Sequence, residues 1–200
     1  DSSTNTTSEL VADLEYLRQQ LGIEKWLVCG ESWGATLALV YAIHHQEHVA
    51  GLILRASFLA CNSDFEWLYT TKGAGAHFYP ECFNEFAHDY TDWHALLDFY
   101  QQQLNSDDQI KASKFAKLWC HWEQVLCHGE PLTNWSLQEP HVGLNQAKLM
   151  VHYFRHHCFI EEGFIAENAH LLTHLPIWFI HGRADLICRY SAVQQLAEKL

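Results

Sequence analysis

Five consecutive residues of this chain, Gly30-Glu31-Ser32-Trp33-Gly34, have the types and spacing of a nucleophile site, G-x-S-x-G. The apolar run at 25–29 predicts a short buried strand before them, and the run at 35–42 predicts a buried helix after them. This context is typical of a nucleophile elbow, a strained turn that exposes the serine hydroxyl. We expect both glycines to be required because side chains there would collide with the strand and the helix. Ser32 is the candidate nucleophile, with a structural tight turn as the alternative, and the backbone N–H of Trp33 is the candidate oxyanion donor.

A serine hydroxyl attacks a carbonyl only when a base removes its proton and an acid orients that base. Asp185 is the candidate acid because it follows the apolar run at 176–180, and open α/β sheets gather active-site groups beyond their strand ends. A turn or helix-cap aspartate is the alternative. An elbow serine predicts the chain order Ser, Asp, His, yet the last histidine, His181, precedes Asp185. We therefore expect an internal fragment of a longer hydrolase, truncated at both ends, with little or no activity by itself.

A third candidate is the carboxylate of Glu123. The residues Trp119, Trp122, Glu123 and Leu126 are spaced i, i+3, i+4, i+7, so they share one face of a predicted helix. A buried carboxylate is unfavourable unless something pairs with it. The partner is either an Arg or Lys of the same helical region, or a cationic group of a substrate.

The elements that must position these residues fall into three blocks. The pattern of residues 1–59 predicts a helix, a strand, a second helix and a second strand. This order is typical of a doubly wound, mostly parallel α/β sheet. Residues 60–172 show helical patterns and no convincing strand, which predicts an inserted helical cap. Within this cap, the run Ser106-Asp107-Asp108-Gln109 predicts a helix start through a capping box. Residues 173–200 return to a buried strand and a final amphipathic helix.

Composition excludes several classes of partner. The formal charge of −12 argues against nucleic acid, which needs a basic patch. No apolar run is long enough to cross a membrane. Seven scattered cysteines do not form a disulfide framework and indicate a reduced, cytoplasmic protein. The histidines four residues apart, His152 with His156 and His170 with His174, lack a zinc pattern, so we expect no metal and no cofactor. The sequence indicates no oligomeric state.

Taken together and in order, these motifs resemble the proline iminopeptidases (prolyl aminopeptidases), which have the α/β-hydrolase fold. The resemblance covers nearly the whole chain. Its segments are Asn5-Thr6-Thr7 with Leu10-Val11-Ala12-Asp13-Leu14-Glu15, Gly30-Glu31-Ser32-Trp33-Gly34 for G-G-S-W-G, Leu54-Arg55-Ala56-Ser57-Phe58 for L-R-G-x-F, Trp119-Cys120-His121-Trp122-Glu123 for W-x-x-W-E, His152-Tyr153-Phe154, and His181-Gly182-Arg183-Ala184-Asp185 for H-G-R-x-D.

The resemblance implies a serine exopeptidase that releases N-terminal proline from peptides through an acyl-enzyme. It makes Ser32 the nucleophile and Asp185 the triad acid. Glu123 would bind the positively charged imino group, and Phe58 and Cys188 would help to form the proline pocket. The family's catalytic histidine and its H-G-G-P-G oxyanion loop have no counterpart in the sequence.

One departure concerns the family's second glutamate, which lies two residues before its H-Y-F. This chain has Met150 there, so we expect weaker binding of the substrate ammonium. Two other hypotheses remain open. The first is a capped α/β-hydrolase that acts on esters or amides without a free amine. The second is a non-catalytic fragment or binding module that keeps the fold without the triad.

Overall fold

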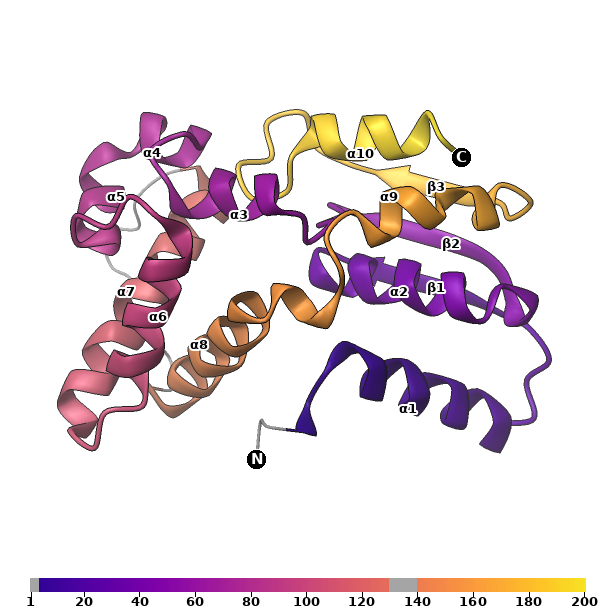
Figure 1. Ribbon diagram of the computed structural model, residues 1–200, viewed down its shortest axis with the longest axis horizontal. Coiled ribbons are helices and arrows are strands. Elements are labelled where there is room, and N and C mark those ends of the chain that lie inside the picture. The colour runs from indigo at the N-terminus through magenta and orange to yellow at the C-terminus, as the bar shows by residue number, and fades with distance from the viewer. Residues whose placement is uncertain (1–3, 130–139) are drawn as a thin grey trace. The chain divides into compact units, whose positions relative to one another are not determined.

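A computed structural model describes residues 4–129 and 140–200 of the chain. The chain divides into two compact units (Figure 1). Unit 1 consists of Asp1–Asp64 and His157–Leu200, and unit 2 of Phe65–His156. The predicted cap boundaries at residues 60 and 172 stay a prediction.

Unit 1 is built on a parallel sheet of three strands in the order β1-β2-β3. In its register, Gly30 of β1 faces Leu54 of β2, which in turn faces Phe179 of β3. The three strands predicted from apolar runs and the α/β class are therefore confirmed. The elements of unit 1 are α1 (Thr7–Gln20), β1 (Trp26–Glu31), α2 (Trp33–His44), η2 (Gln46–His48), β2 (Val49–Arg55), the start of α3 (Asn62–Tyr69), η3 (His157–Phe159), α9 (Phe164–Asn168), η4 (Ala169–Leu172), β3 (Ile177–Ile180) and α10 (Tyr190–Ala197).

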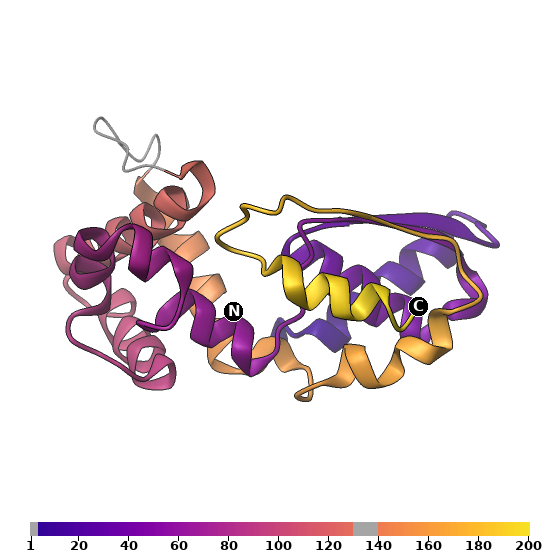
Figure 2. The same cartoon turned by 90° about the horizontal axis from the view of Figure 1, so that it is seen from above.

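The described helices of unit 1 cover one face of this sheet (Figure 2). Leu52 and Leu54 of β2 point into the core on that face and are fully buried. The other face carries Leu27, Trp178 and Ile180, whose side chains are 50%, 53% and 56% exposed. The prediction of a buried strand at 25–29 was therefore wrong for this face. Alternate side chains of a strand point to opposite faces, so helices on one side bury only half of them.

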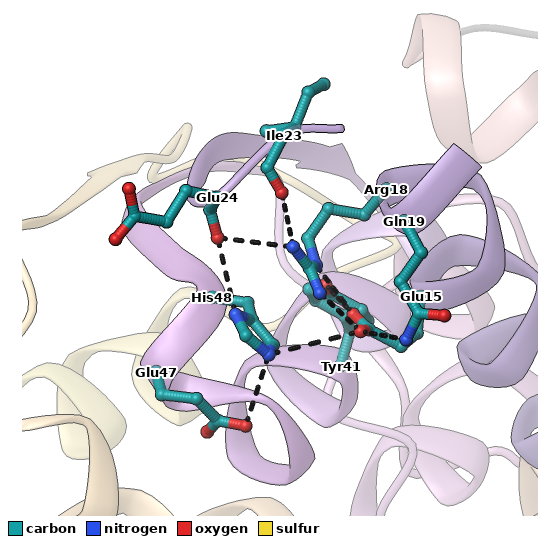
Figure 3. A network of polar contacts seen from close by, with 8 residues as sticks. All are labelled: Glu15, Arg18, Gln19, Ile23, Glu24, Tyr41, Glu47 and His48. Atoms are coloured by element: carbon teal, nitrogen blue, oxygen red, sulfur yellow. Dashed lines mark hydrogen bonds and ion pairs between the residues drawn. The ribbon is translucent and has the colours of Figure 1, made fainter. Parts of the chain in front are cut away.

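A polar network joins α1 to α2 beside this core (Figure 3). Arg18 binds both carboxylate oxygens of Glu15, at 2.9 Å through Nε and 2.6 Å through Nη2, and also donates to the carbonyl of Ile23. Tyr41 of α2 donates its hydroxyl to the same carboxylate at 2.9 Å. The hydrogen bond from Arg18 holds the pKa of Glu15 far below its ordinary value, while burial raises the pKa of Tyr41 to about 12. The network thus fixes the helix that precedes β1 against the helix that follows it.

Unit 2 contains helices and, among its described residues, no strand. Its core is aromatic: Phe86 stacks on Trp122 at 5.6 Å and meets Trp119 edge-on at 5.7 Å between ring centroids. Trp122 also donates its indole N–H to the carbonyl of Leu68 at 3.1 Å. The helices are the remainder of α3, α4 (Ala74–Phe78), α5 (Pro80–Ala87), α6 (Trp93–Leu104), α7 (Gln109–His128) and α8 (Pro140–Arg155).

The start of α7 differs from the predicted capping box. Asp108, not Ser106, is the N-cap, and its carboxylate accepts from the N–H groups of Ile110 at 2.9 Å and Lys111 at 3.2 Å. Ser106 instead accepts a hydrogen bond from the N–H of Asp108. Aspartate and serine cap helices about equally well, so the first favourable residue along the chain is not always the one used.

Candidate active site

Ser32 lies in the sharp turn between β1 and α2, with φ of +54° and ψ of −122°. Only glycine adopts this region without strain, and a side chain held there is typical of a functional site. A Cβ at Gly30 would lie 2.3 Å from the Gly34 carbonyl oxygen, so glycine is required at Gly30. A Cβ at Gly34 would meet nothing within 4 Å, so the expected collision there was wrong.

Hydrogen bonds hold the backbone of this turn from the side of β2. The N–H of Ser32 donates to the carbonyl of Arg55 at 3.0 Å, and its carbonyl accepts from the N–H of Phe58 at 3.3 Å. Trp33 is the first residue of α2, a position at which a helix N–H has no acceptor within the helix. The helix dipole therefore favours negative charge beside Ser32. The oxyanion role of Trp33 stays a prediction.

Phe58 lies just beyond the end of β2 and is 3% exposed. Its carbonyl accepts a hydrogen bond of 2.5 Å from Thr36 Oγ1, a fully buried hydroxyl one turn into α2. Our sequence analysis missed this anchor, although a threonine inside the apolar run at 35–42 could have indicated it. Thr36 thus fixes the segment after β2 against the helix that carries the elbow.

Asp185 follows β3, so it lies at the same edge of the parallel sheet as Ser32 and Phe58. Its Oδ1 accepts from the backbone N–H groups of Ile187 at 2.9 Å and Cys188 at 2.8 Å. These two bonds fix the plane of the carboxylate and leave Oδ2 to accept from another donor. His181 Nε2 lies 3.6 Å from Oδ2 but donates to the carbonyl of Cys188 at 2.8 Å. No hydrogen bond in the described part of the chain joins His181 to Ser32, so His181 does not bridge acid and serine.

Cys188 contacts both Asp185 and Ser32. Its side chain is buried, and its Sγ lies 3.9 Å from the Oγ of Ser32. Its N–H binds Asp185 as described. The structure therefore brings Ser32, Phe58, Asp185 and Cys188 together in unit 1, and the roles assigned to them stay predictions.

Glu123 belongs to α7 of unit 2. It is partly buried, on the helix face that it shares with the buried residues Trp119, Trp122 and Leu126. Burial raises the pKa of Glu123 to about 8, and the indole N–H of Trp119 only partly opposes this shift. No ion pair to its carboxylate is found within residues 4–129 and 140–200. The cation within unit 2 that the sequence allowed as its partner is thus not found among those residues.

Residues 4–129 and 140–200 contain no group of three or more His, Cys, Asp or Glu side chains placed to hold a metal ion. Nδ1 of His156 lies 2.7 Å from the carbonyl oxygen of His152 and forms a hydrogen bond with it. The two residues are four apart in the sequence, which is about one helical turn. No helix in these ranges combines the length and apolar character that crossing a bilayer requires.

Two named relatives are similar to this chain along most of its length. Proline iminopeptidase of Arabidopsis thaliana is 35% identical over 195 residues, which cover 92% of this chain and 50% of that protein. Proline iminopeptidase of Neisseria gonorrhoeae is 35% identical over 197 residues, which cover 97% of this chain and 63% of that protein. The chain spans about half to just under two thirds of the length of the curated relatives that it matches.

The fold is matched by a solved structure and by a family model. An α/β fold family hydrolase from Bacillus anthracis str. Sterne superposes with a TM-score of 0.58 at 19% identity, over 100% of this chain and 65% of that chain. The model of a family described as alpha/beta hydrolase fold matches residues 1–200. With its elbow serine and aspartate at one edge of a parallel sheet, this chain belongs to the α/β-hydrolase fold family.

Proposed function

We propose that the protein is a serine exopeptidase that releases proline from the N-terminus of peptides. The observation that supports this choice of substrate concerns Glu123. It is a partly buried carboxylate without a cationic partner among the described residues. Such a group is unfavourable in the empty protein and becomes favourable when a substrate ammonium pairs with it. Relatives named proline iminopeptidase support the same reading.

In this mechanism Ser32 attacks the carbonyl carbon of the N-terminal proline. The N–H of Trp33 stabilises the oxyanion, and the amine of the next residue leaves. Water then hydrolyses the acyl-enzyme and releases proline. Phe58 and Cys188 line the pocket for the pyrrolidine ring. Asp185 orients the histidine that serves as base, which we expect on the C-terminal side of Asp185 in the full-length protein.

The test compares two substrates of the full-length protein, L-prolyl-p-nitroanilide and its N-acetyl form. Acetylation removes the positive charge and leaves the scissile bond unchanged, so we expect turnover of the free amine only. The readout is nitroaniline release at 405 nm, with Ser32→Ala as the control. Equal turnover of both substrates would instead support a hydrolase without an amine requirement, and turnover of neither by a folded protein would reject the proposal.

The hydrolase without an amine requirement draws its support from Met150. This residue of α8 is partly buried, and its sulfur lies 3.9 Å from the Nε2 of Gln146. A thioether contributes no charge to ammonium binding, so Glu123 would have to bind the amine alone.

We expect Met150→Glu to lower KM for L-prolyl-p-nitroanilide about 10-fold, because a second carboxylate adds a charged hydrogen bond worth about 1–3 kcal/mol. Met150→Gln, which has a similar size and no charge, is the matched control and should leave KM nearly unchanged. Steady-state kinetics measure both. A KM that stays the same in Met150→Glu would contradict the role assigned to this position.

A further inference from the structure

A buried ion pair in unit 1 lies outside the groups used so far. Asp64, in the first turn of α3, is 2% exposed, and its Oδ1 accepts from Arg189 Nε at 2.7 Å. Arg189 Nη2 also donates to Ser63 Oγ at 2.6 Å and to Cys61 Sγ at 3.3 Å. The other oxygen, Oδ2, accepts from the N–H and the thiol of Cys61 at 3.4 and 3.1 Å. One guanidinium thus donates to three side chains of the segment 61–64, those of Cys61, Ser63 and Asp64.

Burial lowers the pKa of Arg189, but the charge of Asp64 and the hydrogen bonds to Asp64 and Cys61 together outweigh that effect, so the pKa is raised above its ordinary value. The guanidinium therefore stays charged at any pH at which the protein is folded. A buried carboxylate paired with a fixed cation in this way holds its position firmly, because separating the two leaves a charge without compensation.

Arg189 directly follows Cys188 and is the N-cap residue of α10. The backbone of Cys188 donates to Asp185 at 2.8 Å and accepts from His181 at 2.8 Å, and its sulfur lies 3.9 Å from Ser32 Oγ. A shift of Arg189 would therefore move the peptide group that fixes the carboxylate of Asp185 and the thiol beside the nucleophile.

We infer that Arg189 is a positioning residue: through its ion pair with Asp64, it sets the loop that places Asp185 and Cys188 relative to Ser32. This inference rests on the proposed function, in which Asp185 is the triad acid. Arg189 touches none of these side chains itself, so its effect on catalysis is transmitted through the backbone of Cys188.

The test separates positioning from stability with three variants of the full-length protein: Arg189→Gln, Asp64→Asn and the double variant. Arg189→Gln leaves Asp64 buried and unpaired, so both the unfolding temperature and the catalytic rate should fall. The double variant carries no unpaired charge and should recover the unfolding temperature. Its kcat should remain about 10- to 100-fold below that of the wild type with KM little changed, because the acid is no longer held in place.

A second readout does not depend on the substrate. A fluorophosphonate forms a bond to the activated Ser32 Oγ and releases fluoride, and its rate of reaction reports how well the triad is assembled. We expect this rate to fall in Arg189→Gln and in the double variant by the same factor as kcat. The matched control is Arg155→Gln, which removes the same atoms from the ion pair between Arg155 and Asp98 on unit 2, of 2.6 Å, and should change neither rate.

A double variant with wild-type kcat and a wild-type rate of phosphonylation would overturn the inference and leave the pair a purely structural role. So would Arg189→Gln with both rates unchanged. A wild-type protein that is phosphonylated at Ser32 but does not hydrolyse prolyl substrates would reject only the proposed substrate, because the labelling rates still measure the effect of Arg189. A wild-type protein that is not phosphonylated would overturn both proposals.

Discussion

Replacing Ser32 by alanine should lower kcat for L-prolyl-p-nitroanilide by a factor of about 10⁴ or more, since in the proposed mechanism the Oγ of Ser32 is the atom that forms the acyl-enzyme. The loss should leave the fold intact. Among the described residues, the only hydrogen bond of the Ser32 Oγ is the long one to the Sγ of Cys188, at 3.9 Å, so its loss should cost little stability. Progress curves measure the rate, and circular dichroism with thermal unfolding verifies the fold. Residual activity above one per cent of the wild-type value would show that another residue is the nucleophile.

A second variant at the same position uses the strained backbone. Ser32→Gly should abolish turnover equally, yet raise the free energy of unfolding by about 1–2 kcal/mol, because glycine adopts φ of +54° with ψ of −122° without the strain of a side chain. Chemical denaturation compares the glycine and alanine variants. If the glycine variant is no more stable than the alanine variant, the turn is not strained in the way that its dihedral angles indicate.

Replacing Glu123 by glutamine should produce the second largest loss, about 10²-fold in kcat/KM for substrates with a free amine. The glutamine side chain keeps the shape of glutamate but cannot compensate the charge of the substrate ammonium. Phosphonylation of Ser32 by a fluorophosphonate, which involves no substrate amine, should be unaffected. The measurement is the ratio of kcat/KM for L-prolyl-p-nitroanilide to the rate of phosphonylation. An unchanged ratio would exclude Glu123 from amine binding.

The same variant should change stability in the opposite direction. Burial raises the pKa of Glu123 from the ordinary 4.5 to about 8, so the folded protein retains a proton that the unfolded chain has already released. This group therefore does not change the free energy of unfolding below pH 4.5. It lowers the free energy of unfolding progressively as the pH rises from 4.5 toward 8, and its contribution is then constant. Glu123→Gln removes this penalty and should raise the free energy of unfolding by about 1–3 kcal/mol at pH 8 and hardly at all at pH 4. Denaturation at the two pH values tests this sign.

The sequence was most informative where local pattern and chemistry coincide. The strand, turn and helix around Ser32 were predicted because the glycine spacing and the two apolar runs are all local. The position of Asp185 at the edge of the sheet was predicted for the same reason, since this residue follows an apolar strand. The spacing of Trp119, Trp122 and Glu123 likewise predicted a carboxylate on an aromatic helix face.

Contacts between distant segments could not be predicted in this way. Nothing near Arg189 in the sequence indicates that its partner is Asp64, because the pairing depends on how α3 and α10 meet in space. The exposure of Trp178 was missed because an apolar run alone does not say which face of a strand has helices packed against it. The N-cap of α7 was misplaced because Ser106 and Asp108 are chemically equivalent choices.

The parallel pairing of β2 with β3 also has a consequence for the order of folding. Arg55 and Ile180 face each other in the sheet, but about 120 residues separate the end of β2 from the start of β3, and all of unit 2 lies between them. On a ribosome, β1, β2 and the elbow emerge first, and the inserted helices can condense before β3 has been synthesised. Ser32 is therefore in its turn before β3 is made, and the serine and Asp185, the two groups that the proposed mechanism needs side by side, meet only once β3 has paired with β2.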